Sequence, residues 1–458
     1  MTLKNSIFGS WTFYKRFLAI AFPVMAQQLI QNFVSLVDNF MVAGLGDVKM
    51  SGVNVTNQVS FIFLTIINTI CISAGIFMSQ FNGAKQKEKM QQTFNFKLTI
   101  CGTFGLLFTI FCFIAPRNVF ELMLKNNTDA SSILDQSVMY SRAFALSWIF
   151  AVLSQSIATS LREIEIVRPP LIISICATLI NTFLNWVLIY GNLGAPRLEV
   201  KGAAYATVVA RIAEFLIFVI YVSKKRPDFL FNPFKGLKID LKLYSSIFRK
   251  SGMLLYSEVF WAFSETFSNA LYNTRGGAEV VSGMSSGFAV ANLIFICIGG
   301  ITTSTGVILG QELGANKIEE CKKEKNWILS GAFFLGIIFM IIGFLSTFLV
   351  NIVFGNLSEQ SRLYAKELII ITSIYLPLWT FLNGQYAISR TGGDTTMGVI
   401  CDTIGNILFI GGMIILTFCT KLNPIAMYAI VKLSDIPKMI VAYFWLKKEK
   451  WLVNLTLK

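Results

Sequence analysis

The sequence predicts an all-α integral membrane protein with twelve transmembrane helices in two pseudo-symmetric lobes of six helices each. Three observations support this fold class. The 458 residues are 54% hydrophobic and 14% charged, with a mean hydropathy of +0.63, a balance unlike that of an ordinary soluble domain. The apolar runs are about 20 to 30 residues long, which suits helices that span a bilayer rather than barrel strands. Finally, the second half of the chain repeats the first.

Twelve apolar stretches define the expected helices in order. With boundaries uncertain by about four residues, they cover residues 15–43, 51–81, 93–115, 132–160, 166–191, 201–223, 248–274, 282–312, 326–354, 364–388, 396–418 and 424–446. The segment after the sixth stretch is polar and interrupted by Pro227 and Pro233, as linkers are. We therefore expect an N-terminal six-helix lobe over 1–223, a cytoplasmic linker over 224–247 and a C-terminal six-helix lobe over 248–458.

The internal repeat has one offset of 231 positions, without gaps, from the first stretch to the loop after the second. The offset aligns Gly46 with Gly277, Ser51 with Ser282, Gly52 with Gly283, Gly75 with Gly306, Gln80 with Gln311, Gly83 with Gly314 and Ala84 with Ala315. Six helices return the chain to its starting side, so both copies keep the same orientation. This predicts two lobes related by an axis along the membrane normal, with a cleft at their interface.

The distribution of Lys and Arg predicts the orientation, because cytoplasmic loops carry an excess of both. With the N-terminus inside, about 26 Lys and Arg fall on the inner side and about 9 on the outer side, and the opposite orientation reverses that ratio. We expect a multi-pass protein of the cell membrane with both termini in the cytoplasm. The net charge of +14 then belongs to inner loops and not to a nucleic-acid surface.

Several kinds of site are excluded by composition. The chain has no His, so a His metal ligand, a His proton relay and a His-based triad are impossible. Its eight Cys form no CxxC pair and most lie inside apolar runs, which argues against disulfides and zinc. We expect no enzyme activity, no cofactor and no resident metal. The first apolar run follows directly on Trp11 to Arg16, so we also expect no cleavable signal peptide.

A polar stripe marks the first helix. Its members fall on one helical face, opposite Leu29, Phe33 and Phe40, and they are Gln27, Gln28, Gln31, Asn32, Ser35, Asp38 and Asn39. Such a stripe is costly in a spanning helix unless it meets water or protein. It can line a cavity or hydrogen-bond to neighbouring helices; we favour the cavity because the stripe ends in a carboxylate.

Asp38 is the strongest single candidate for function. It lies roughly 33 Å along the helix axis from Arg16, and therefore toward the extracellular side. A carboxylate there is stabilised by a proton or by a bound cation, which is the chemistry that an ion-coupled switch needs. The alternative is a solvated Asp38 at the membrane interface. Pro23, earlier in the same helix, removes a backbone hydrogen bond and permits a bend.

The seventh helix carries a second polar face with Glu258, Trp261 and Glu265. These two acids either contact a substrate or ion, or they form an ion pair with Arg275 or with a neighbouring helix. Elsewhere, Asn181 and Asn185 lie one turn apart and can face the same partner. We expect Arg211 and Glu214 to pair with each other. The other intramembrane polar groups are Thr207, Asp402 and Asn406. The aromatic residues Tyr140, Trp148, Tyr375 and Trp379 can form the floor of a cavity for flat cations.

These residues resemble the multidrug and toxic compound extrusion family, the MATE transporters, over essentially the whole chain. The resemblance is carried by Pro23 and the pattern Asp38-x-x-Met41-x-x-Gly44 in the first helix. Paired loop motifs add to it, with SQFNGAK at residues 79–85 and GQELGAN at 310–316. The stretch KGAAYAT at 201–207 and the pair Glu258-x-x-Trp261 are also similar to family members.

The resemblance implies export of drugs or metabolites by antiport against H⁺ or Na⁺ through alternating access. In one branch of the family, the residues matching Asp38 and Pro23 are proposed to drive release. That branch also places an Asn and an Asp of the fifth helix, and a Thr of the sixth, around the same ion. These match Asn181, Asn185 and Thr207, and Asn185 departs from the usual Asp. Hard cations favour anionic oxygens, so we expect H⁺ in preference to a transient Na⁺ at Asp38.

Another branch of the family uses acids in the seventh and tenth helices. Glu258 or Glu265 matches the first of these, whereas the tenth helix has no acid at its centre, which puts a second cation site in doubt. The expected ion-coupling residues are thus Asp38, Asn181, Asn185 and Thr207. The expected substrate cavity is lined by Gln31, Tyr140, Glu258, Trp261 and Glu265, and Pro23 bends the first helix.

The favoured function is therefore an exporter of amphipathic, often cationic, small molecules coupled to a cation, acting as a monomer in the bilayer. A flippase for lipid-linked precursors is a second interpretation, but such proteins usually have more helices and a cationic cavity. A membrane enzyme or receptor is a third, against which stand the absence of His and of any soluble domain.

Overall fold

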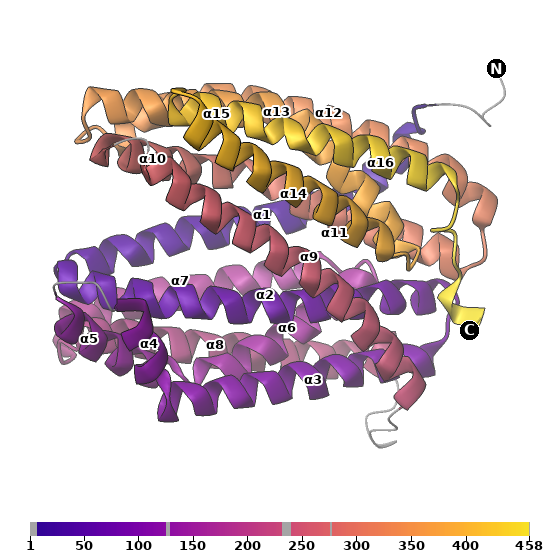
Figure 1. Cartoon of the computed structure of the whole chain (residues 1–458). Helices are drawn as coiled ribbons and strands as arrows, with labels where there is room; N and C mark the ends of the chain where they lie inside the picture. Colours follow the sequence, from indigo (N-terminus) through magenta and orange to yellow (C-terminus); the bar gives the residue numbers. More distant parts are fainter. Residues whose placement is uncertain (1–6, 125–128, 231–239, 275–276, 458) are drawn as a thin grey trace. The chain divides into compact units, whose positions relative to one another are not determined.

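The computed structural model describes residues 7–124, 129–230, 240–274 and 277–457, and these residues form helices, turns and loops without a β-strand (Figure 1). Contacts divide the chain into two compact units. Unit 1 contains residues 1–25 and 252–458, and unit 2 contains residues 26–251. Two helices pass from one unit to the other: α1 (Trp11–Ala43) after Met25, and α9 (Leu241–Thr274) after Ser251. The lobe boundaries that the sequence predicts stay a prediction.

Unit 2 is a bundle of long helices with two shorter ones. After α1 they are α2 (Asp47–Gly83), α3 (Lys87–Ile114), α4 (Pro116–Leu124), α5 (Ala130–Phe144), α6 (Ser147–Glu163), α7 (Arg168–Tyr190) and α8 (Glu199–Lys225), with short 3₁₀ turns η2 (Asn192–Gly194) and η3 (Asp228–Leu230). Helix α2 packs on α3, α5 and α6, while α8 packs on α5, α6 and α7. The two prolines in the first turn of α7 suit a helix start, and Gly191 ends it in a left-handed conformation with φ 78°.

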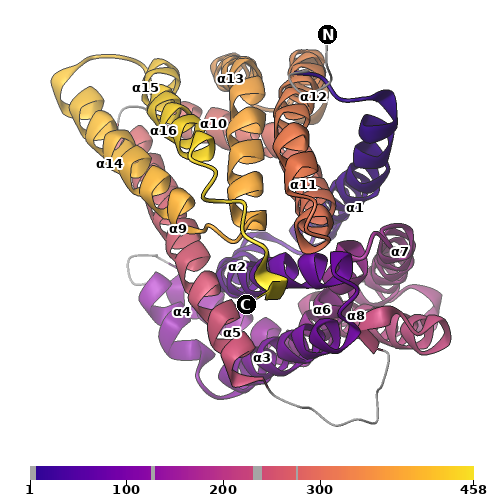
Figure 2. The ribbon, with the colours of Figure 1, turned by 90° about the vertical axis from the view of Figure 1, so that its right-hand side faces the viewer.

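Unit 1 is arranged around α13 (Glu359–Thr391), which packs on α10, α11, α12, α14, α15 and α16 (Figure 2). The other elements are α10 (Ala278–Ile294), α11 (Ile296–Gly314), α12 (Ile318–Val353), α14 (Thr396–Cys419), α15 (Pro424–Val431), η4 (Lys432–Ser434), α16 (Asp435–Lys447) and η5 (Leu455–Leu457). Side chains cap two helix starts: Ser358 Oγ accepts from the Ser361 amide, and Asn423 Oδ1 accepts from the Ala426 amide.

Small residues allow α12 and α13 to lie close together. A Cβ at Gly336 would meet Pro377 Cα at 2.6 Å, and one at Gly343 would meet Ser373 Oγ at 2.0 Å. Glycines two turns apart on one helical face let helix backbones approach in this way, and small residues have the same role where helices associate in lipid. The N-terminal end of α1 joins the same unit, since Ser304 Oγ donates to the Phe17 carbonyl oxygen at 3.0 Å.

Nine helices of the described residues, with α10 and α11 counted together, are long and apolar enough to cross a membrane, and α5 with α6, bent by 54° at their break, meets the same criteria as a pair. The protein is therefore a multi-pass helical membrane protein. The sequence-predicted stretch 132–160 corresponds to this bent pair, 282–312 corresponds to α10 and α11, and 424–446 corresponds to α15, η4 and α16. Helices α9 and α15–α16 are not among the ten spans, and both carry charged residues in their central turns.

Candidate functional site

Asp38 lies in a polar cluster built by three helices of unit 2. It is half-buried near the end of α1, and Asn185 of α7 donates a hydrogen bond from Nδ2 to Asp38 Oδ1 at 2.7 Å. Asn181, one turn earlier, accepts from the same Asn185 nitrogen at 3.2 Å and donates to Thr207 Oγ1 of α8 at 3.2 Å. The structure thus brings together all four residues predicted to couple to an ion.

The Asn181 amide fits this cluster in two orientations. With its nitrogen turned toward Asp38, it donates to Oδ2 at 3.0 Å and to Oδ1 at 3.3 Å, while its oxygen accepts from the Thr207 hydroxyl at 3.2 Å. This orientation gives the Asn181 nitrogen a carboxylate acceptor and its oxygen a hydroxyl donor, so it satisfies both ends of the amide.

Asn185 carries an unused acceptor inside the cluster. Its side chain is only 2% exposed, and its Oδ1 accepts no hydrogen bond from any described residue. A buried carbonyl oxygen without a donor is costly. With the oxygens of Asp38, Asn181 and Thr207 nearby, the site offers one carboxylate and three neutral oxygens. This donor set can take up a single positive charge, either as a proton on Asp38 or as a cation among the oxygens.

The earlier turns of the α1 stripe are used for helix packing. Gln27 and Gln31 both donate to Ser174 Oγ of α7, at 3.1 and 3.2 Å, and Arg162 of α6 donates to Gln27 Oε1 at 2.7 Å. These are the interhelical hydrogen bonds that polar residues make in membranes. The lining of a substrate cavity by Gln31 stays a prediction.

Tyr140 lies near the polar cluster of Asp38, in the core of unit 2. It is 7% exposed and packs in one apolar group with Val42 of α1 and Ala203 of α8, while its ring stacks on Phe144 at 5.5 Å. Pro23 is buried within α1, two residues before the point at which the helix passes from unit 1 to unit 2. The Arg211–Glu214 pair predicted within α8 is confirmed, with Nη1 to Oε2 at 2.7 Å.

The predicted residues of α9 have different surroundings. Trp261 is 49% exposed, and Glu258 is half-buried without a hydrogen bond or ion pair to the described residues. Glu265 forms an ion pair with Lys432 of η4. This is the pairing with a neighbouring helix that the sequence left as an alternative to substrate contact, whereas Arg275, the other expected partner, lies outside the described residues.

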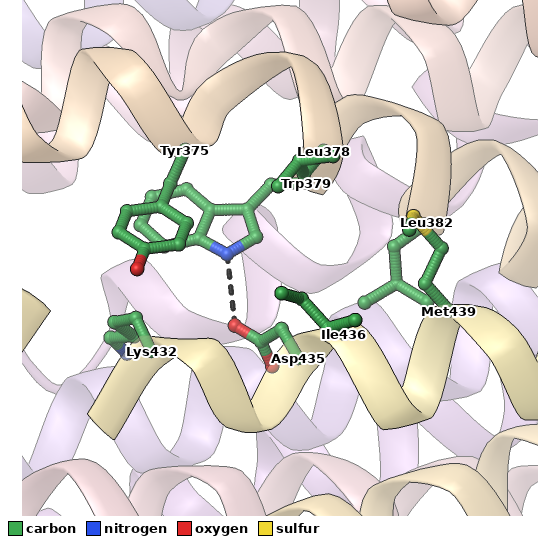
Figure 3. Close-up of a pocket in the computed structure, with 8 residues that line it drawn as sticks. All are labelled: Tyr375, Leu378, Trp379, Leu382, Lys432, Asp435, Ile436 and Met439. Carbon is green, nitrogen blue, oxygen red and sulfur yellow. Dashed lines mark hydrogen bonds between the residues drawn. The ribbon is translucent and has the colours of Figure 1, made fainter. Parts of the chain in front are cut away.

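A small pocket in unit 1 lies next to this ion pair. It is lined by Tyr375, Leu378, Trp379, Leu382, Lys432, Asp435, Ile436 and Met439 (Figure 3). Trp379 Nε1 donates to Asp435 Oδ2 at 2.9 Å, and the Tyr375 and Trp379 rings stack at 5.7 Å. The pocket therefore combines aromatic faces from α13 with charged groups from η4 and α16.

Lys432, Asp435 and Lys438 were missed by the sequence reasoning. A signal was present, because three charges at intervals of three residues interrupt the apolar stretch 424–446, and such charges mark functional positions in membrane helices. Lys97 in the third stretch was missed in the same way. Its ammonium is fully buried and pairs with Glu163 of α6 at 2.6 Å. The structure supplies the partners that the sequence pattern did not indicate.

The fold and these buried polar sites define a multi-pass helical membrane protein with charged groups held inside its spanning helices, the class to which membrane transporters belong. The MatE family model matches residues 23–187 and 254–415. The chain therefore belongs to the MatE family, whose members are transporters and not enzymes.

Two relatives and one solved structure illustrate the similarity. The chain is 27% identical over 401 residues to "Probable multidrug resistance protein YoeA" of Bacillus subtilis, covering 83% of this chain and 80% of that protein. It is 22% identical over 360 residues to "Probable multidrug resistance protein NorM" of Halalkalibacterium halodurans, covering 78% and 77%. An outward-facing multidrug resistance MATE family transporter of the MOP superfamily has the same fold, with a TM-score of 0.84, 18% identity and 95% of both chains covered.

Proposed function

We propose that this protein exports amphipathic, cationic small molecules across the cell membrane in exchange for protons. The observation that carries the proposal is the Asp38 cluster, in which a carboxylate of a spanning helix is hydrogen-bonded by neutral amide groups of α7, while Arg211 of α8 acts on it electrostatically. A single charge on such a group is expensive in a membrane, so gain and loss of a proton changes the local packing. The names of the relatives support drugs as substrates.

Protons are favoured over Na⁺ because Asp38 is the only carboxylate of the cluster. Na⁺ binds better where a second acid adds anionic charge, and Asn185 supplies an amide instead. The transport cycle that we propose alternates between outward- and inward-facing states of two six-helix lobes, with α9 and the α15–α16 pair as the remaining two of twelve spans and both termini in the cytoplasm. Coupling requires that proton and substrate favour different states.

The test is efflux of a fluorescent organic cation from proteoliposomes, with pH and Na⁺ gradients imposed separately. We expect a pH gradient to drive efflux by the wild type and Asp38→Asn to abolish that response, since the amide cannot exchange a proton. Asp47→Asn is the matched control, because Asp47 is an exposed acid at the start of α2. Efflux by Asp38→Asn that still follows the pH gradient would remove Asp38 from the mechanism. If efflux by the wild type responds only to the Na⁺ gradient, the coupling ion is Na⁺ and not the proton.

A further inference from the structure

Lys432 has surroundings that are usual for a bound organic cation rather than for a lysine. Its side chain is 11% exposed, and its ammonium lies over three aromatic rings, at 4.6 Å from Phe409, 5.3 Å from Tyr428 and 5.8 Å from Trp379. One such contact occurs about once per 70–80 residues in proteins. Three on a single buried ammonium, with the carboxylate of Glu265 as its counter-ion, form an aromatic cage for a cation.

The cage stands at a break in a helix. Lys432 begins the 3₁₀ turn η4, which separates α15 from α16, and 3₁₀ turns within a helical segment mark hinges. In transporters, interrupted helices of this kind bring substrate and ion sites to the middle of the membrane. The ammonium can therefore leave the cage through rotation of a short turn, without unfolding a long helix.

The cage is filled in this structure. The adjoining pocket, lined by Trp379, Lys432 and Asp435 (Figure 3), has a volume of about 10 Å³, which is room for roughly one water molecule. A larger ligand enters only if the lysine side chain moves away. Asp435 lies three residues further on and lines the same pocket, so it offers an acceptor to the displaced ammonium.

We propose that the Lys432 side chain is a tethered competitor that occupies an organic-cation site formed by Glu265, Phe409, Tyr428 and Trp379, and that a substrate cation binds by displacing it. The inference rests on the proposed function for the identity of the transported molecules, but the binding site itself does not. The site selects weakly hydrated cations such as quaternary ammonium and phosphonium ions. These lose less hydration than a primary ammonium on entering the cage and gain the same aromatic contacts.

A tethered competitor lowers the apparent affinity of the site by the fraction of time that the site is open. Removing it should therefore tighten cation binding, whereas removal of a lysine that only supports the fold should weaken binding or leave it unchanged. This opposite sign separates the two roles. Lys438 is the matched control. Its side chain is also 11% exposed and pairs with Asp435 at 3.0 Å, but no cation–π contact between it and a described ring is found.

The experiment is equilibrium binding of tetraphenylphosphonium to the purified full-length protein in detergent at constant pH. We expect Lys432→Met to lower the Kd about tenfold or more, because Glu265 and the three rings are then free to contact the added cation. Lys438→Met should leave the Kd within about twofold. The double variant Lys432→Met/Glu265→Gln should lose the gain, and Lys432→Met/Trp379→Leu should lose part of it.

An unchanged or higher Kd in Lys432→Met would overturn the proposal, and so would an equal gain in Lys438→Met or a gain that persists without Glu265. Gel filtration and thermal unfolding check that each variant is folded, and Lys432→Gln replaces Lys432→Met if the latter is not. The same experiments distinguish a failure of the proposed function from a failure of the cation site. A wild type that exports no cation under any gradient would reject antiport, while tighter binding by Lys432→Met would still support the cage.

Discussion

At the scale of single residues, the buried Lys97–Glu163 pair stabilises the N-terminal half. The Lys97 ammonium has no exposed surface and donates to both carboxylate oxygens of Glu163, at 2.6 and 2.8 Å, with Thr159 and Ser160 as further acceptors. Gly75 of α2 leaves the space for the Glu163 carboxylate, because a Cβ there would lie 2.3 Å from Oε1. Three helices, α2, α3 and α6, thus meet at one charge pair.

We expect Lys97→Met to destabilise the protein by about 3–5 kcal/mol, since it leaves the buried Glu163 carboxylate without its hydrogen-bonded cation. Lys87→Met is the control. Lys87 pairs with Asp228 at 2.7 Å, but both side chains are 51% exposed, so its loss should cost less than about 1 kcal/mol. Unfolding in mixed detergent micelles measures both. The double change Lys97→Met/Glu163→Gln should recover part of the loss, and equal effects of the two single variants would contradict the argument.

The choice of coupling ion also depends on single residues, because Asn185 occupies the position at which the resemblance predicts an Asp. Asn185→Asp places two carboxylates within hydrogen-bonding distance, where their repulsion favours a shared cation. We expect this variant to gain Na⁺-driven efflux of about tenfold over the wild type, a change of about 1.4 kcal/mol in the barrier. Asn192→Asp, in the turn after α7, is the control. Proteoliposomes with a Na⁺ gradient at equal pH give the measurement, and no gain would show that the remaining donors do not hold Na⁺.

At the scale of elements, the breaks between helices are the feature that the hydropathy pattern did not predict. The apolar stretch 132–160 contains no Pro or Gly, yet α5 and α6 meet at 54°. Ser147 Oγ donates to the Phe144 carbonyl oxygen at 2.7 Å, and a serine hydroxyl that bonds to the preceding turn can bend a helix. Hydropathy reports the length of a span but not such local hydrogen bonds, so the sequence predicts one helix over 132–160 without its bend.

Pro23 is the element-scale feature with a direct test. It lies inside α1 just before the helix passes from unit 1 to unit 2, and it removes a backbone hydrogen bond at that point. We expect Pro23→Ala to keep the fold and the affinity for substrate but to lower the rate of efflux about tenfold. Pro377→Ala, at the other proline inside a long helix, should keep the rate within about twofold. Equal rates for wild type and Pro23→Ala would show that α1 need not bend.

At the scale of the whole molecule, the sequence predicted the helical membrane class and the Asp38 cluster for an identifiable reason. A polar group in an apolar stretch is conspicuous, and Asn181, Asn185 and Thr207 match a known arrangement. The partner of Glu265 was not predictable in this way, because Lys432 lies 167 residues away in the chain. Periodicity assigns residues to faces of one helix, whereas the pairing of faces depends on packing. The count of twelve spans stays a prediction for a related reason, since Glu258, Glu265 and Lys432 lower the hydropathy of the segments concerned.

The orientation of the chain is the last property of the whole molecule that can be tested. The loops before α3 and α12, together with the first turns of these helices, hold equivalent positions in the repeat and are both rich in lysine, so we expect them to lie inside. The end of α14 then lies outside, and its Cys419 is exposed. We expect a membrane-impermeant maleimide to label Cys419 in intact cells, and Cys419→Ser to remove that label.

The inner side has its own reporter in the same assay. Cysteine placed at Asn316, in the loop between α11 and α12, should react in the Cys419→Ser background only after the membrane is permeabilised. Cys176 is also exposed, but it lies within α7, which is long and apolar enough to span the membrane, so we expect acyl chains to keep out a charged reagent and to prevent a background label. If Asn316→Cys is labelled in intact cells, and Cys419 of the wild type is labelled only after permeabilisation, the orientation is the opposite of the one expected. It would also place Asp38 near the cytoplasm, where protons would reach it from the opposite side.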